Sequence, residues 1–375
     1  MSLSLELLAS LQVTSGPDTS SSGFPAQVRS YRLTEGLSQI PELSLVVEVE
    51  HGDYLLSDLL RKEATFGLRR AIDAEEDSRW FHGIVVEAEE LEEVGNMIPY
   101  RLKIVPTLWL TKRSRNSRIF QDITVTDVIS EVLQPYGIDG SKLEMLASAT
   151  YPQLDYCVQY EESDYAFVCR LMEQVGAFFW FEHSDGEHVL KIGDSNQDFG
   201  TAAAPTYDYE PPSSSATSPH IFRFRPSKEV RPGKVSLLDH RYKPPGAVDE
   251  NYSGSLDDDL EVYEQPGGYP DVNIPADGAG AQDSEANSQW GGLPQVRHEE
   301  LAVRAARVRG ESTIFGMCPG GRFTVDFPGD YNNNDFDEGT EYLLTRVVHV
   351  GEPGEGSGPG SSGPALYSNS YRVIP

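Results

Sequence analysis

The stretch Tyr156–Asp194, YCVQYEESDYAFVCRLMEQVGAFFWFEHSDGEHVLKIGD, changes its hydrophobic period twice, and these changes decide the fold around it. Ser163 can begin a helix that ends at Gly176, because the apolar residues between them recur at helical spacing. Those residues are Phe167, Val168, Leu171, Met172 and Val175. The segments Phe178–His183 and His188–Ile192 follow as strands around an Asp-Gly dipeptide, which suits a tight primed turn. The stretch therefore predicts a helix and then a β-hairpin.

A second informative stretch lies upstream. It reads WFHGIVVEAEE at Trp80–Glu90 and YRLKIVPTLWLTKRSRNSRIFQDITVTDVISEVLQPYGI at Tyr100–Ile138. Thr124 can cap a helix, with Asp127 three residues later as in a capping box, and Gly137 can end that helix. Residues 109–200 are therefore expected to form one compact α/β unit.

Most of the remaining chain is patterned for strands. Apolar and polar residues alternate over Leu43–Val49, and several such short segments within residues 1–108 predict a small barrel or sandwich. Further strand candidates are Leu3–Val13, Phe81–Val86, Tyr100–Ile104, Ile221–Phe224, Lys234–Tyr242, Arg322–Phe327 and Glu341–Val350. A third helix is expected at about Gln295–Arg309, with Leu301, Ala305 and Val308 on one face. The predicted fold class is α+β, and mainly β.

Some segments lack either pattern. Asp249–Gln289 is acidic and rich in glycine and proline, so it is expected to be an irregular, solvent-facing insertion. Gly351–Pro364 is a low-complexity glycine-serine segment, which predicts a mobile loop.

The composition excludes some classes of function. The 375 residues suffice for two to four domains, and the formal net charge of -29 argues against a nucleic-acid-binding surface, which is normally basic. No run approaches the roughly 18 apolar residues that cross a bilayer, and the N-terminus lacks the basic region of a signal peptide. Cys157, Cys169 and Cys318 are too scattered for a disulfide framework, and the first two are expected to pack as small hydrophobes.

Two groups of residues resemble metal sites only superficially. His183 and His188 flank Asp185 and Glu187, but the hairpin turn explains this spacing, and the histidines are expected to meet solvent. A calcium-loop pattern starts further along the chain, where the residues at positions one, three, five and twelve are Asp330, Asn332, Asn334 and Glu341. Asp335 replaces its required glycine and the flanks resemble strands, so a hairpin loop is favoured there.

Catalytic motifs are also missing from the sequence. Gly310-Glu311-Ser312 lacks the second glycine of a nucleophile elbow, and the chain contains no P-loop and no HExxH motif. Acidic residues are so frequent that no glycosidase-like pair can be singled out. We therefore predict no catalytic, cofactor-binding or metal-binding residue and no cofactor.

Two basic runs interrupt the acidic chain. They consist of Lys112, Arg113, Arg115 and Arg118, and of Arg297, Arg304, Arg307 and Arg309. A solvated face is the favoured interpretation, and salt bridges to an acidic neighbouring subunit are the alternative.

Taken together, the stretches Trp80–Gly137 and Tyr156–Asp194 resemble the valine-glycine repeat protein G family, the spike proteins of type VI secretion systems, which are related to the baseplate hub of contractile phage tails. Glu341–His349 and Tyr371–Pro375 resemble the closing segment of that family. Leu260–Tyr263, followed by Pro266-Gly-Gly-Tyr269, resembles its tyrosine-proline-glycine stretch.

The resemblance implies a structural protein rather than an enzyme. Family membership implies a homotrimeric hub in which each chain carries two barrels similar to a tail-tube subunit, so that three chains match a sixfold tube to a threefold needle. The expected domains are a first barrel at 1–108, the α/β unit at 109–200, a second barrel at 201–250 and 301–365, and an acidic insertion at 251–300. Family members continue into a barrel and a β-helical needle, so residues 366–375 are expected to begin a connection to a C-terminal spike that is missing here or is a separate protein.

The implied partners are two further copies of the chain, the hexameric tube protein, baseplate components and secreted effectors, without nucleic acid. The implied location is the bacterial cytoplasm during assembly, followed by translocation when the machine contracts. The alternatives are the hub of a phage tail or of an extracellular injection particle and, in a different class, a cell-wall or glycan hydrolase.

Overall fold

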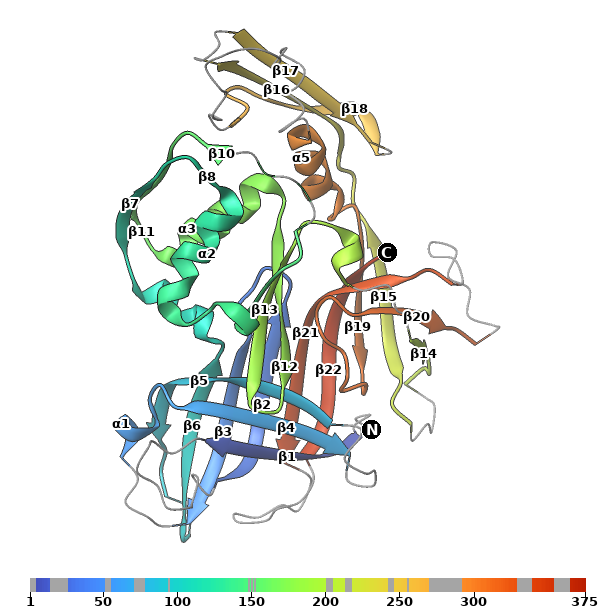
Figure 1. Ribbon diagram of the computed structural model, residues 1–375. Helices are drawn as coiled ribbons and strands as arrows, with labels where there is room; N and C mark the ends of the chain where they lie inside the picture. The colour runs from blue at the N-terminus through green and yellow to red at the C-terminus, as the bar shows by residue number, and fades with distance from the viewer. Residues whose placement is uncertain are drawn as a thin grey trace.

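The computed structural model describes the chain in segments, which are 5–13, 26–50, 55–70, 78–93, 95–147, 149, 151, 153–199, 205–212, 218–241, 246–254, 256–269, 292–328, 339–353 and 365–375. Strands dominate these residues, and a large antiparallel sheet forms the centre of the molecule (Figure 1). The predicted mainly-β, α+β class is confirmed. Residues 330–338 of the calcium-loop pattern and residues 354–364 of the predicted glycine-serine loop lie outside the described residues.

The first barrel is built from the N-terminal strands and closes on the C-terminal ones. Its strands are β1 (Leu5–Val13), β2 (Gln27–Gly36), β3 (Glu42–Glu50), β4 (Glu63–Arg70), β5 (Ser78–Glu90), β6 (Met97–Val105), β21 (Tyr342–Pro353) and β22 (Ala365–Ile374). They neighbour each other in the order β2, β3, β6, β5, β4, β1, β22, and β21 closes the ring because it pairs with both β22 and β2. The alternation predicted over Leu43–Val49 explains how β3 fits this barrel. The apolar residues of this strand point into the barrel interior and are buried there.

A second barrel reuses the same C-terminal hairpin. Its other strands are β14 (Thr206–Asp208), β15 (Ile221–Lys228), β19 (Ala306–Ser312) and β20 (Arg322–Asp326). β14 pairs with β20 on one side, and Tyr209 forms a bridge to Ile221 on the other, so the ring closes through β20 and β21. Phe224, Val308 and Phe323 lie in its core.

The β21–β22 hairpin therefore belongs to both barrels. Tyr367 is buried in the first core, while Tyr371 and Val373, on the same face of β22, are buried in the second. All but the last of residues 366–375 form the strand β22, and the expectation that they begin a connection to a spike stays a prediction. Tyr367, Tyr371 and Val373 are apolar at period two, so the segment can fill two cores as a strand.

The α/β unit lies beside the first barrel (Figure 1). It contains α2 (Val125–Leu133), α3 (Asp164–Val175) and the hairpin β12 (Phe178–Ser184) with β13 (Glu187–Gly193). Small elements complete it, namely η2 (Thr107–Arg113), β7 (Asn116–Phe120), β8 (Ile123–Thr124), η3 (Gln134–Tyr136), η4 (Gly140–Lys142), β9 (Leu143–Met145), β10 (Gln153–Leu154), β11 (Cys157–Glu162) and η5 (Asn196–Phe199). The short α1 (Leu56–Leu59) belongs to the first barrel.

The predicted helix ends of the α/β unit are confirmed. The Thr124 and Ser163 hydroxyls accept hydrogen bonds from the backbone N–H of Asp127 and Ala166, which satisfies amides at each helix start. Gly137 and Gly176 end the two helical stretches with φ of 70° and 74°, a left-handed conformation that glycine adopts at low cost.

A small outer sheet stands apart from the barrels (Figure 1). β16 (Pro232–Arg241) lies between β17 (Gly246–Ser253) and β18 (Asp257–Glu264), and α5 (Leu293–Ala302) packs against it. This corrects two expectations. Part of the segment predicted to be irregular forms paired strands, and most of residues 232–250, assigned to the second barrel, belong to this outer sheet. Val235 and Leu237 are buried under α5, which supplies the small core that the strands need.

The third predicted helix is only half correct. α5 ends at Ala302, and Ala306–Ser312 forms β19 instead. Val308, Gly310 and Ser312 are buried at period two between β15 and β22, so tertiary packing overrides the apparent helical spacing.

Candidate interaction surface

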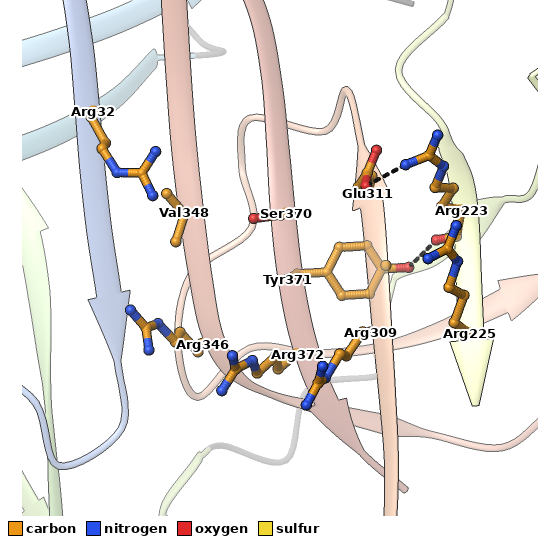
Figure 2. Close-up of a pocket in the computed structure, with 11 residues that line it drawn as sticks. Arg32, Arg223, Arg225, Arg309, Glu311, Arg346, Val348, Ser370, Tyr371 and Arg372 are labelled. Atoms are coloured by element: carbon orange, nitrogen blue, oxygen red, sulfur yellow. Dashed lines mark hydrogen bonds and ion pairs between the residues drawn. The ribbon is translucent and has the colours of Figure 1, made fainter. Parts of the chain in front are cut away.

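Four arginines form a ladder across the outer face of the second barrel. Arg225 on β15 lies directly opposite Arg309 on β19, Arg309 lies opposite Arg372 on β22, and Arg372 lies opposite Arg346 on β21. Figure 2 shows their guanidinium groups on one side of the sheet. We call these four residues the arginine ladder.

The alternation of each strand explains why the arginines face outward. Phe224, Val308, Val347 and Tyr371, which are sequence neighbours of the ladder residues, are all buried in the core of the barrel. Since successive side chains of a strand point to opposite faces, the arginines must lie on the other face. A one-residue register slip would send them into the core, so the fold specifies their position strongly.

Further residues surround the ladder and shape a shallow hollow. The hollow has a volume of about 400 Å³, and Arg32 on β2 and Arg223 on β15 also line it. Arg223 is neutralised within the chain, because its guanidinium lies 2.7 Å from the Glu311 carboxylate. Figure 2 shows this pair at one side of the hollow and Arg32 at the other.

The ladder carries unbalanced positive charge. Within the part of the chain that the structure describes, no carboxylate forms an ion pair with any of the four guanidinium groups. Desolvation, followed by the charges of Arg309, Arg346 and Arg307, lowers the pKa of Arg372. Opposed like charges on neighbouring strands are destabilising, so this arrangement costs stability in the isolated chain.

A buried ionic network lies in the first barrel, next to the shared hairpin. Arg79 on β5 contacts the carboxylate of Glu35 on β2, donates 2.8 Å to the Phe315 carbonyl and lies 2.6 Å from His349 on β21. His349 also lies 2.6 Å from the Tyr367 hydroxyl. Burial raises the pKa of Glu35, but Arg79 and His349 outweigh it and hold this pKa at about 2. The network joins strands from both ends of the chain.

Three histidines fill the junction between the first barrel and the α/β unit. His82 Nδ1 on β5 lies 2.8 Å from His188 Nδ1 on β13, and the His82 amide donates 3.2 Å to His183 Nδ1 on β12. The prediction that His183 and His188 meet solvent is therefore wrong, because the hairpin tip folds back onto β5. Burial lowers the pKa of His183 to about 4 and of His188 to about 3. Among the described residues, no group of three or more His, Cys, Asp and Glu side chains is arranged to hold a metal ion.

The first basic run is engaged within the α/β unit. Lys112 lies 4.6 Å from the Tyr165 ring centre and Arg113 lies 4.4 Å from that of Trp109. Arg118 pairs with Asp164, and Arg115 donates 2.6 Å to the Glu161 carbonyl.

The second basic run is divided by the fold. Arg297 pairs with Glu300 at 3.4 Å and Arg307 with Glu229 at 3.1 Å. Arg309 alone joins the ladder. Local sequence patterns do not single out Arg225, Arg346 and Arg372, because these residues come from separate strands and only the pairing register brings them together.

Other candidate residues serve as packing groups. Cys157 is buried, as predicted, and Ser312 is buried with its hydroxyl 2.8 Å from the Asn369 side-chain oxygen. Ser312 is thus a core residue rather than an accessible nucleophile. Among the described residues, no helix is both long and apolar enough to cross a bilayer.

Comparison with known proteins identifies the family of this architecture. Residues 34–355 match the model of the phage tail baseplate hub (GPD) family. The type VI secretion system spike protein VgrG1b of Pseudomonas aeruginosa is 31% identical over 320 residues, which cover 82% of this chain and 40% of that protein. The spike protein VgrG1a of the same organism is 29% identical over 306 residues, covering 79% of this chain and 45% of that protein. The chain thus spans less than half the length of these relatives.

Solved structures share the fold. A type VI secretion component of E. coli superposes with a TM-score of 0.66 at 17% identity, covering 98% of this chain and 76% of that chain. A tail protein of Neisseria meningitidis superposes with a TM-score of 0.58 at 13% identity, covering 98% of this chain and 96% of that one. Because the family model matches most of its residues, this chain belongs to the phage tail baseplate hub family.

Proposed function

We propose that the chain is the structural hub of the puncturing spike of a type VI secretion machine. Three copies form a ring that joins the sixfold tube to the threefold needle. The observation that carries this proposal is the pair of closed barrels that share the β21–β22 hairpin within one chain. Three such chains supply six barrels, which is the number that a sixfold tube requires.

The shared hairpin also supports a mechanical role. A hub must transmit the push of the tube without bending between its barrels. Here two adjacent antiparallel strands run continuously from one barrel into the other, and the buried Glu35–Arg79 pair links β2 and β5 beside them. Closed barrels additionally leave few free strand edges for unwanted pairing.

The proposed partners are the hexameric tube protein, baseplate components and secreted effectors. A structural relative from Francisella was solved as a PdpA–VgrG complex, which superposes with a TM-score of 0.58 at 9% identity over 98% of this chain and 57% of that chain. The hub assembles in the bacterial cytoplasm and is translocated when the machine contracts. We assign neither the needle function nor a cargo function to residues 1–375.

We propose no reaction and no catalytic, metal-binding or cofactor-binding residue for this chain. The hydrolase alternative finds no support, since the relatives compared above are spike, secretion-system and tail proteins. The buried carboxylates Glu35 and Asp164 are both held by arginines, which suits structural roles better than acid–base work. The phage-tail alternative is favoured by one observation, the likeness to the Neisseria tail protein.

Molar mass in solution and tube binding test the proposal. Light scattering of the purified chain at high concentration, from physiological to high salt, should give three times the mass of one chain. Electron microscopy should then show the trimer seated on the end of rings of the tube protein encoded beside it. A chain that stays monomeric under all these conditions, or a trimer that ignores the tube rings, would contradict the hub function.

A further inference from the structure

We propose that the arginine ladder of one copy binds the acidic outer sheet of a neighbouring copy, centred on β18. This inference rests on the proposed trimeric hub and adds to it the identity of one contact surface. It would make the contact head-to-tail, because each copy contributes the ladder to one neighbour and the outer sheet to the other. Such contacts close into a ring when the rotation between copies permits.

The ladder needs an anionic partner from outside the chain. Its four guanidinium groups stand opposite one another and have no carboxylate partner among the described residues. A bound carboxylate would relieve the repulsion that, after desolvation, lowers the pKa of Arg372. Arginine forms charge-assisted hydrogen bonds with carboxylates in a planar, two-point geometry, so a row of arginines suits a surface rich in Asp and Glu.

The outer sheet supplies such a surface on the same polypeptide. Residues 246–264 contain seven acidic residues and no lysine or arginine. Asp259, Glu261 and Glu264 are exposed on β18, which is an edge strand of the described sheet. Lys234 contacts Glu261 at 3.0 Å, which leaves the surface strongly acidic. Tyr263 lies on the same face of β18 as Asp259 and Glu261 and is 58% exposed, so it can add apolar contact area to the charge pairs.

The dimensions of the two surfaces are compatible. Strands lie about 4.8 Å apart in a sheet, so the ladder extends over roughly 14 Å. Alternate side chains along one strand are roughly 6.6–6.8 Å apart, so Asp259 and Glu261 can both lie within the length of the ladder. The outer sheet stands apart from the barrels, which leaves β18 able to reach another copy (Figure 1).

Nucleic acid fits this face less well than an acidic protein surface does. Proteins that bind single strands usually stack bases on exposed aromatic side chains. The exposed tyrosines of the described residues are Tyr156, Tyr160 and Tyr263, and none of them lies on a ladder strand. The net charge of -29 would also repel a polyanion.

Charge reversal tests the contact directly. We would measure trimer dissociation by sedimentation at physiological salt for the full chain, for R309E/R372E and for D259K/E261K. Each double variant should weaken the trimer at least tenfold. The combined variant R309E/R372E/D259K/E261K should return dissociation to within threefold of the unmodified chain, because it exchanges the two signs. The neutral pair R309Q/R372Q should weaken the trimer without introducing repulsion.

The controls separate this inference from the hub proposal. R101E/R115E makes the same charge change on exposed arginines away from the ladder and should leave the trimer unchanged. Circular dichroism and melting temperature show that each variant is folded. If the unmodified chain trimerises and R309E/R372E trimerises equally well, or if the combined variant stays dissociated, this inference fails while the hub stands. Binding of a labelled single-stranded oligonucleotide by the unmodified chain, lost in R309E/R372E, would also overturn it.

Discussion

Arg309 lies directly opposite Arg372 on adjacent antiparallel strands, on the outer face of a barrel in a strongly acidic protein. Opposed like charges are an unfavourable choice for the stability of a sheet. The positions of the two arginines follow from the register that buries Val308 and Tyr371. The fold therefore cannot avoid the loss of stability that comes from their repulsion. The relationship is the basis for the contact between copies proposed above.

Removing one charge from the ladder should stabilise the isolated chain. Arg309→Gln is expected to raise the free energy of unfolding by about 0.2–1 kcal/mol, because it ends the repulsion by the neighbouring arginine on each side. Urea unfolding at a protein concentration low enough to dissociate the trimer measures this, and Arg101→Gln, which loses an exposed pair with Glu89, is the control. A loss of stability in Arg309→Gln would show that the ladder contributes favourably within one copy.

Breaking the buried ionic network should be strongly destabilising. Arg79→Ala leaves the Glu35 carboxylate buried without its cation, which is expected to cost about 3–5 kcal/mol. Chemical denaturation at pH 7 gives the value. The matched change Arg101→Ala breaks an exposed pair and should cost no more than about 1 kcal/mol. Equal effects of the two substitutions would argue that the network is not a structural link.

Mild acid should loosen the junction between the first barrel and the α/β unit. The pKa values of His183 and His188 are lowered to about 4 and about 3 from the ordinary 6.5, first of all by burial. The unfolded chain thus binds more protons than the folded chain below pH 6.5, so stability falls as the pH drops from 6.5 towards 4.

The His183→Asn variant tests this origin of the acid sensitivity. Asparagine can still accept the hydrogen bond from the His82 amide but does not titrate. Its free energy of unfolding should depend less on pH between 6.5 and 4, by up to about 1.4 kcal/mol per pH unit. An unchanged slope would place the acid sensitivity elsewhere.

Gly310 should not tolerate a side chain. A Cβ atom at this position would lie 2.1 Å from Cζ of Tyr371, whose ring covers the glycine from the neighbouring strand. Gly310→Ala is therefore expected to cost about 1–3 kcal/mol through overpacking. Gly292→Ala, where nothing lies within 4 Å, is the control. If Gly310→Ala behaves like Gly292→Ala in thermal unfolding, the close contact is easily relaxed.

Local sequence signals predicted the elements that depend on local chemistry. Thr124 and Ser163 cap the two helices of the α/β unit, and Gly137 and Gly176 end them, because capping involves residues only a few positions apart. The alternation over Leu43–Val49 likewise predicted a strand whose apolar face is buried. The Asp-Gly turn predicted the hairpin of β12 and β13.

Long-range pairing decided what the sequence left ambiguous. Val308 fits both a helical and a strand pattern, and it is a strand residue because β15 and β22 flank it. His183 follows a polar turn pattern, yet its ring nitrogen Nδ1 lies 3.2 Å from the His82 amide, because the hairpin packs against β5. Neither outcome is encoded in the neighbouring residues, since both depend on a surface brought from a distant part of the chain.

The sequence by itself determined the mainly-β class, the family resemblance and the capped helices, since periodicity, turn residues and caps act over a few positions. Only the tertiary structure decided that β21 and β22 serve two barrels and that Arg225, Arg309, Arg372 and Arg346 form one row. These arginines are up to 147 positions apart in the chain. They meet because cross-strand register is set by burying the opposite face of each strand, a constraint that acts on the whole sheet at once.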